Sequence, residues 1–147
     1  MMPAPVSLTL QASYAHLRAG AEALGSLLAQ SGAPAELASG CELALQELLT
    51  NIVDHAYDED ATRQIGLRLQ VENTGQERRL TIETEDGGRP AEVDLQSVAM
   101  PDPLDLQEGG YGMAIITSLM DEVSYRRDGS NNRWKLVKVF QPQLNRK

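Results

Sequence analysis

The segment CELALQELLTNIVDHAYDED, residues 41–60, constrains the fold more than any other part of the chain. At about 100° per residue, its apolar side chains form one continuous stripe, which predicts an α-helix lying against a core. The stripe consists of Leu45, Leu48, Leu49, Ile52, Val53 and Ala56. The helix can begin as early as Pro34, because a proline loses nothing in a first helical turn. Gly40 weakens that extension by about 1 kcal/mol relative to Ala, which predicts a bent or separate first turn.

A second face of this helix is polar. Glu47 and Asn51 are four residues apart and His55 follows four residues later, so the three side chains project along the same line. A carboxylate and a carboxamide in this arrangement can share a metal ion or a water. Taken alone, an exposed Glu and Asn on a helix more often belong to a face that only contacts solvent and has no catalytic or binding role. His55 is interpreted as a structural hydrogen-bonding group and is not assigned to catalysis.

The remaining segments predict strands and two further helices. Strict alternation of apolar and polar residues predicts two strands that pair as an antiparallel hairpin across the turn at 73–76. The expected strands are 6–10, 65–71, 80–84, 123–127 and 133–140, and the additional helices are 13–31 and 113–120. This order predicts an α+β protein, a two-layer α/β sandwich with a mixed, mostly antiparallel sheet and helices on one face. A chain of 147 residues fits a single domain, residues 1–147.

Charge and composition exclude several classes of function. The net charge of −8 and the lack of a clustered basic patch argue against a nucleic-acid partner. The only cysteine, Cys41, cannot form an internal disulfide, which favours a reducing cytoplasm. No apolar run approaches the roughly 18–20 residues that cross a membrane. His16 is interpreted as a surface residue, and Trp134 as a packing residue in the last strand.

Two glycine-rich clusters stand at the ends of predicted elements. Asp86-Gly87-Gly88-Arg89-Pro90 follows a strand, and Gly109-Gly110-Tyr111-Gly112 precedes a helix. Glycines that open a helix expose backbone N–H groups to an anion such as phosphate, although either cluster alone is more often a turn. Between them, residues 91–108 contain two prolines, five acidic residues and no periodicity. A loop this long in a compact domain is usually a lid or a binding loop.

Together the clusters match a known family. The helix carries E-x-x-x-N-x-x-x-H-A-Y, the strand end carries D-x-G-x-P, and the third motif reads Gly-Gly-Tyr-Gly-Met-Ala-Ile at 109–115. In this order and spacing, the chain resembles the GHKL ATPases, whose nucleotide-binding domain has the Bergerat fold. Within them it resembles the anti-sigma factor serine kinases of bacteria. The similarity extends weakly over most of the chain.

The resemblance implies ATP and Mg²⁺ as cofactors. Asn51 would hold Mg²⁺, a hard ion that prefers oxygen ligands and keeps several waters. Glu47 would be the catalytic residue, a general base that takes the proton from the attacking hydroxyl. Both roles come from the family motif, and they give the polar face of the helix a function.

The resemblance also implies the rest of the nucleotide site. Asp86 would accept a hydrogen bond from the adenine amino group, and Gly88 would give the ring room. Gly110 and Gly112 would bring backbone N–H groups to the phosphates. Residues 91–108 would be the lid that closes over ATP. A threonine near the last hairpin contacts adenine in many of these proteins, and the corresponding residues here are Ser130-Asn131-Asn132.

The implied function is an ATP-dependent serine kinase that phosphorylates an anti-sigma factor antagonist and also sequesters a sigma factor, as a homodimer. Two alternatives stay open. One is an ATP-binding module without catalysis that works by sequestering a protein. The other is a histidine-kinase-like catalytic domain, although the short segment before Glu47 leaves little room for its usual phosphoacceptor hairpin. A gyrase-like ATPase is disfavoured, because its transducer domain does not fit in this length.

Overall fold

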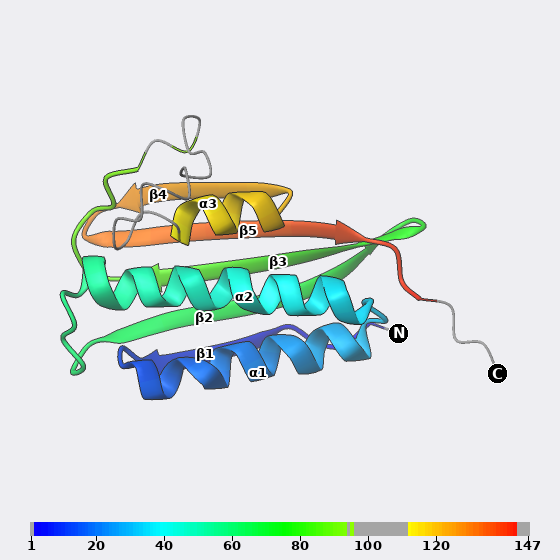
Figure 1. Ribbon diagram of the computed structural model, residues 1–147, viewed down its shortest axis with the longest axis horizontal. Coiled ribbons are helices and arrows are strands. Elements are labelled where there is room, and N and C mark those ends of the chain that lie inside the picture. Colours follow the sequence, from blue (N-terminus) through cyan, green and yellow to red (C-terminus); the bar gives the residue numbers. More distant parts are fainter. Residues whose placement is uncertain (1, 94, 96–111, 144–147) are drawn as a thin grey trace, which may run out of the picture.

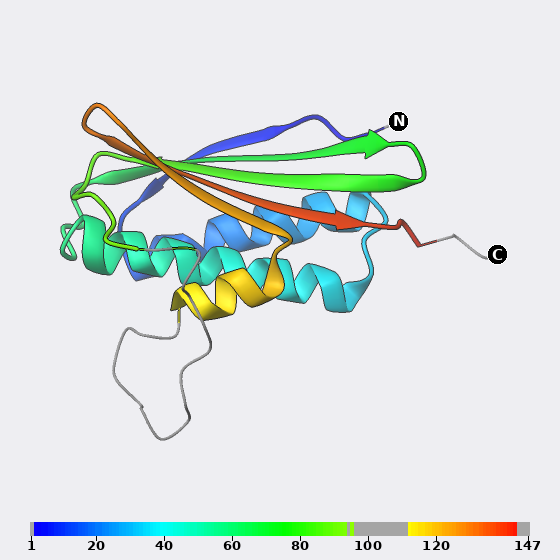
Figure 2. The ribbon, with the colours of Figure 1, turned by 90° about the horizontal axis from the view of Figure 1, so that it is seen from above.

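The computed structural model describes residues 2–93, 95 and 112–143 of the chain. Its strands form one sheet in the order β1-β2-β3-β5-β4, and each pair of neighbouring strands is antiparallel. The helices cover one face of this sheet and leave the other face open (Figures 1 and 2). The predicted α+β sandwich is confirmed, and the pairings in the described ranges include no parallel one, so the sheet is more regular than expected.

The predicted elements are present with small changes at their ends. The strands are β1 (Val6–Gln11), β2 (Gln64–Thr74), β3 (Glu77–Asp86), β4 (Glu122–Asp128) and β5 (Asn131–Phe140). The helices are α1 (Tyr14–Gln30), α2 (Ala35–Asn51), the π-helical turn η1 (Ile52–Ala56) and α3 (Gly112–Leu119). No helix in the described ranges has the length and apolar character needed to cross a membrane.

The alternation in the strands decides which side chains meet the helices. Ile65 and Leu69 of β2 are fully buried, as are Ile82 of β3 and Leu136 of β5. In the register of the sheet, Leu69 pairs with Ile82 and Ile82 pairs with Leu136, so these side chains lie on one face. Asp86 pairs with Asn132 on that same face, because it lies an even number of residues after Ile82.

Helix α2 begins directly after Pro34, as predicted, but differs from its prediction at Gly40 and at its C-terminal end. It runs without a break through Gly40, where an added Cβ would lie 3.4 Å from Leu119 of α3. The predicted bend is therefore wrong, and the glycine lies where the two helices approach each other. The predicted end at Asp60 is also wrong. Asp58 and Glu59 have φ angles of 53° and 62°, and this left-handed backbone ends the helix.

The last turn of this helical segment is π-helical. The Tyr57 N–H donates to the carbonyl of Ile52 at 3.0 Å, five residues earlier, instead of four as in an α-helix. Such turns are frequent at functional sites. The apolar stripe itself is confirmed, because its members are buried in the core apart from a partly buried Ala56. The π turn follows directly after Asn51, at the end of α2 that faces the predicted site.

Candidate nucleotide site

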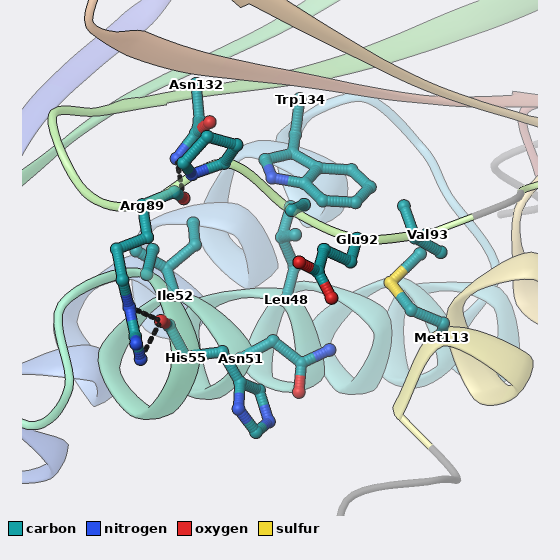
Figure 3. Close-up of a pocket in the computed structure, with 13 residues that line it drawn as sticks. Leu48, Asn51, Ile52, His55, Arg89, Glu92, Val93, Met113, Asn132 and Trp134 are labelled. Carbon is teal, nitrogen blue, oxygen red and sulfur yellow. Dashed lines mark hydrogen bonds between the residues drawn. The ribbon is translucent and has the colours of Figure 1, made fainter.

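A cavity of about 600 Å³ opens where α2 and η1 meet the start of α3 and the sheet (Figure 3). The helices contribute one wall, the segment after β3 a second, and the first residues of β5 the third. The lining residues are Leu48, Asn51, Ile52, His55, Ala56, Arg89, Pro90, Ala91, Glu92, Val93, Met113, Asn132 and Trp134. Four segments that are distant in the sequence therefore meet at one cavity, a concave setting in which small molecules and cofactors bind.

Asn51 and Gly112 lie against each other. An added Cβ at Gly112 would be 2.9 Å from Nδ2 and 3.1 Å from Oδ1 of Asn51. The first residue of α3 thus lies beside the carboxamide predicted to hold a metal ion. His55 also lines the cavity, and Figure 3 shows its ring and the Asn51 side chain on neighbouring turns. Gly110 and most of the predicted lid at 91–108 lie outside the described residues.

Glu47 lies one helical turn before Asn51 and is partly buried. It is not among the residues that line the cavity, as far as the described residues bound it. The predicted pairing with Asn51 on one helix holds, because both residues are within α2. The structure places Glu47 beside the cavity and not in its wall.

Asp86 is the last residue of β3 and only 2% exposed. Its Oδ1 accepts hydrogen bonds from the Gly88 N–H at 2.9 Å and from Nδ2 of Asn132 at 2.8 Å. Its Oδ2 is buried and has no hydrogen-bond partner among the described residues. Burial raises the pKa of this carboxyl, and the hydrogen bond from Asn132 opposes that rise. A buried acceptor without a partner suits the amino group of a bound base.

Gly88 is needed for packing. An added Cβ would lie 2.4 Å from the carbonyl oxygen of Ala56, which is closer than real contacts allow. The next residue, Arg89, donates its N–H to that same carbonyl at 2.8 Å. The strand end therefore packs directly on the last turn of η1. The suggestion that Gly88 gives a base ring room stays a prediction.

Arg89 is a second link between the strand end and the helix. Its Nε and Nη2 atoms donate to the carbonyl of His55 at 3.2 Å and 3.0 Å, as the dashed lines in Figure 3 show. These bonds satisfy a carbonyl that the helix end would otherwise leave without a partner. Sequence analysis did not identify Arg89, because a lone arginine in a loop carries no signal of its partner.

Asn132 was not assigned a role either, yet it connects Asp86 to the cavity. It is 1% exposed, lines the cavity and bonds to Asp86. Trp134, predicted to be a packing residue, is 6% exposed with its ring centroid 4.7 Å from that of Tyr125. The packing role is confirmed, and the indole also forms part of the cavity wall.

Neither Ser13 nor His16 is among the described residues that line this cavity. Ser13 is the N-cap residue of α1, but its hydroxyl contacts Nδ1 of His16 at 2.6 Å and makes no cap bond to a backbone N–H. His16 is exposed, as predicted. The contact ties His16 to the start of α1.

The chain belongs to the family described as the histidine kinase-like ATPase domain, whose model matches residues 10–138. A curated relative is the serine-protein kinase RsbW of Halalkalibacterium halodurans, 36% identical over 93 residues. That alignment covers 59% of this chain and 54% of the relative, so the chain spans about half the length of the curated relative. The resemblance predicted from the sequence, to GHKL ATPases and among them to anti-sigma factor serine kinases, is confirmed.

Two solved structures share the fold. The RsbU and RsbW domains of Rv1364c from Mycobacterium tuberculosis align with a TM-score of 0.68 and 18% identity, over 95% of this chain and 34% of that one. The SiaB–SiaC complex from Pseudomonas aeruginosa aligns with a TM-score of 0.61 and 15% identity, over 92% of this chain and 89% of that one. At these identities the likeness concerns the fold alone.

Proposed function

We propose that the chain is an ATP-dependent serine protein kinase and anti-sigma factor, which phosphorylates an anti-sigma factor antagonist and sequesters a sigma factor. One observation carries this proposal. In a chain of an ATPase family, Asn51 and Asn132 line one cavity, Gly112 lies against Asn51, and Asn132 holds the buried carboxylate of Asp86, one oxygen of which has no partner among the described residues. The relative named a serine-protein kinase supports serine as the acceptor.

The site residues fit ATP and Mg²⁺ in their donors and acceptors. Oδ2 of Asp86 would accept a hydrogen bond from the adenine amino group, which would give that buried oxygen its missing partner. The carboxamide oxygen of Asn51 would hold Mg²⁺, which commonly takes few protein oxygens and completes its shell with phosphates and waters. The N–H groups of Gly110 and Gly112 would bind phosphate oxygens at the start of α3.

Phosphoryl transfer needs little covalent chemistry from the protein. Mg-ATP would supply the transferred phosphoryl group and offset its charge. Glu47 would take the proton of the attacking serine hydroxyl. The serine oxygen forms a bond to the γ-phosphorus while the bond from that phosphorus to the bridging oxygen of ADP breaks, and phosphoserine and ADP result. Glu47 lies one helical turn before Asn51 and is not among the described residues that line the cavity, so the serine of the partner would approach on the Glu47 side of Asn51.

The arrangement of the whole protein follows from the same proposal. Residues 1–147 would form a single ATP-binding domain, and residues 91–108 would be the lid that closes over the nucleotide. The fold is shared with the structure solved as a SiaB–SiaC complex, which supports a protein partner. We infer a cytoplasmic homodimer that contacts neither nucleic acid nor membrane.

The kinase step is tested by incubating the purified chain with Mg-ATP and a candidate antagonist and measuring phosphoserine. Glu47→Ala should keep nucleotide binding and lose transfer, whereas Asn51→Ala should lose the Mg²⁺-dependent part of binding. Glu36→Ala is a matched control, because it removes the same group from the first turn of the same helix. Normal transfer by Glu47→Ala would contradict its role as the base. An absence of phosphoserine with every antagonist tested would contradict the kinase proposal.

A second function is an ATP-binding module that sequesters a partner without catalysis. Glu47 is absent from the described residues that line the cavity, and this observation favours the second function. In that case the antagonist would bind, nucleotide would bind, and no ADP would form in the mixture. A histidine-kinase-like activity would instead produce acid-labile phosphate on a histidine such as His16. Measuring ADP and the acid stability of any phosphate separates the three functions.

A further inference from the structure

The side-chain amide of Asn132 uses all of its hydrogen-bonding capacity within the protein. Its Nδ2 donates to Oδ1 of Asp86 at 2.8 Å and to the carbonyl of Arg89 at 2.7 Å. Its Oδ1 accepts from the hydroxyl of Tyr125 at 2.6 Å and from Nη1 of Arg127 at 2.9 Å. A carboxamide offers two donors and one oxygen with two lone pairs, so no capacity is left for a ligand. Asn132 therefore acts on the cavity through its neighbours.

These partners leave one orientation for the amide. The nitrogen faces a carboxylate and a carbonyl, which only accept, and the oxygen faces a hydroxyl and a guanidinium, which donate. An aspartate at 132 would place an oxygen against both acceptors. A serine or threonine has one hydroxyl proton and can donate to only one of them. The site thus requires the two N–H groups of an amide at this position.

The first consequence is the orientation of Asp86. Its Oδ1 receives the N–H groups of Asn132 and Gly88, whereas Oδ2 receives none from the described residues. Two donors on one oxygen fix the rotation of the carboxylate about its Cβ–Cγ bond. Oδ2 is then the only oxygen of Asp86 that keeps its full accepting capacity among the described residues.

The second consequence is the position of the cavity wall. The Arg89 carbonyl is held directly by Asn132, and the Ala91 N–H donates at 2.9 Å to the Tyr125 hydroxyl that in turn donates to Asn132. Both Arg89 and Ala91 belong to the wall that follows β3. One amide therefore aligns the recognition carboxylate and the adjacent wall with each other.

We propose that Asn132 is a positioning residue that sets the base selectivity of the nucleotide site. It holds Asp86, which lies behind Asn132 in the cavity wall, so that Oδ2 is the one acceptor left for a base, and this acceptor matches the amino group of a 6-aminopurine and opposes the oxygen of a 6-oxopurine. The inference rests on the proposed function, because it presupposes that a purine nucleotide binds here. A site built to bond a particular group rejects an analogue without it by large factors, since its buried partner is left unpaired.

The test compares ATP with ITP, which differs from ATP only by an oxygen in place of the 6-amino group, using calorimetric dissociation constants at fixed Mg²⁺. The wild-type chain should prefer ATP by about 100-fold or more. Asn132→Asp should reduce this ratio at least about tenfold, mainly through weaker ATP binding. Asn131→Asp, the same substitution one residue earlier, should leave the ratio unchanged. A purely structural role of Asn132 would weaken both nucleotides equally and leave the ratio intact.

A second variant keeps the test decisive if Asn132→Asp fails to fold. Tyr125→Phe removes only the hydroxyl that joins Asn132 to Ala91, and it should lower the ATP to ITP ratio while the thermal unfolding temperature stays near that of the wild type. Wild-type selectivity in the folded variants would overturn the inference and leave ATP binding intact. Equal binding of ATP and ITP by the wild type would overturn it as well. If the wild type bound neither nucleotide, the proposed function itself would fail.

Discussion

Asp86 combines a cost in stability with the role in base recognition proposed above. The side chain is 2% exposed, and one of its two oxygens has no partner in the described part of the protein. A buried polar group without a partner costs about 1–3 kcal/mol. The raised pKa of Asp86 has the same physical origin, because burial penalises the charged form. A ligand that donates to Oδ2 would recover part of this cost on binding.

Asp86→Asn separates the two effects. The asparagine keeps an oxygen for the N–H groups of Gly88 and Asn132 and removes the buried charge, so we expect a thermal unfolding temperature at pH 7 no lower than that of the wild type. ATP affinity should fall by about 100-fold, since an NH₂ group would then face the adenine amino group. Glu83→Gln, an exposed change on the same strand, is the control for both measurements. A marked loss of stability with normal ATP affinity would contradict this assignment.

Because of Cys41, we expect the free energy of unfolding to depend on pH in the alkaline range. The thiol is 1% exposed within the core, and burial raises its pKa from 9.0 to about 11. Between these values the unfolded chain has lost the thiol proton and the folded chain has kept it. The free energy of unfolding therefore falls as pH rises, by an amount on the order of 2 kcal/mol from this group. Urea denaturation at pH 8 and pH 11 measures how much free energy of unfolding is lost between the two pH values. The loss should be smaller for Cys41→Ala than for the wild type, and equal losses would contradict the prediction.

Gly88, which follows β3, packs on η1, and Gly112, which begins α3, packs on α2, so the two glycines have different neighbours. At Gly88 the neighbour is the backbone of Ala56, which cannot move aside without distorting η1. At Gly112 the neighbour is the end of the Asn51 side chain, which can rotate away. The same substitution at the two positions should therefore affect different properties of the protein.

Gly88→Ala should destabilise the fold by about 1–3 kcal/mol or more, because the added methyl overpacks backbone. Gly112→Ala should leave the unfolding temperature within a few degrees of the wild type and instead weaken Mg²⁺-dependent ATP binding at least about tenfold, as Asn51 is displaced. Gly66→Ala, where the nearest atoms are 3.8 Å away, is the control. Thermal unfolding and calorimetry distinguish the outcomes, and unchanged ATP binding by Gly112→Ala would contradict the metal role proposed for Asn51.

The fold as a whole brings the site to one end of the helical layer. The helices cover one face of the sheet, and the cavity opens where α2 with η1, the segment after β3, and β5 come together (Figures 1 and 3). A ligand in this position contacts three separate parts of the chain at once. Ligand binding should therefore stabilise the entire fold and not only one loop.

Mg-ATP at about 100 times its dissociation constant should add about 2.7 kcal/mol to the free energy of unfolding. For a chain of this size the unfolding temperature should rise by about 5–10 °C. Differential scanning fluorimetry with Mg-ATP, ATP plus EDTA, and Mg-GTP measures the effect, and only the first should give the full increase. Trp134, the only tryptophan and part of the cavity wall, provides an independent fluorescence signal of binding. An unfolding temperature that does not change when Mg-ATP is added would contradict the proposal that this cavity binds a nucleotide.

Much of the fold and part of the site follow from local patterns in the sequence. Alternation located the strands and the apolar stripe located the buried face of α2, because each reflects the repeat of one backbone conformation. The motifs also selected Asn51, Asp86 and Gly112, which the structure brings to the same region. Local patterns did not reveal the π turn after Asn51, since the turn and the left-handed residues behind it depend on how the helix end packs against the strand end.

The contacts that complete the site depend on the register of the sheet. Asp86 and Asn132 are 46 residues apart and become partners only because β3 and β5 pair in that register. Register is chosen by the hydrophobic pattern of all strands together, so no segment by itself contains it. By itself the sequence therefore determined which elements form and which residues carry a family motif. Only the tertiary structure decided that the Asn132 amide orients the Asp86 carboxylate and that Ala56 packs against Gly88.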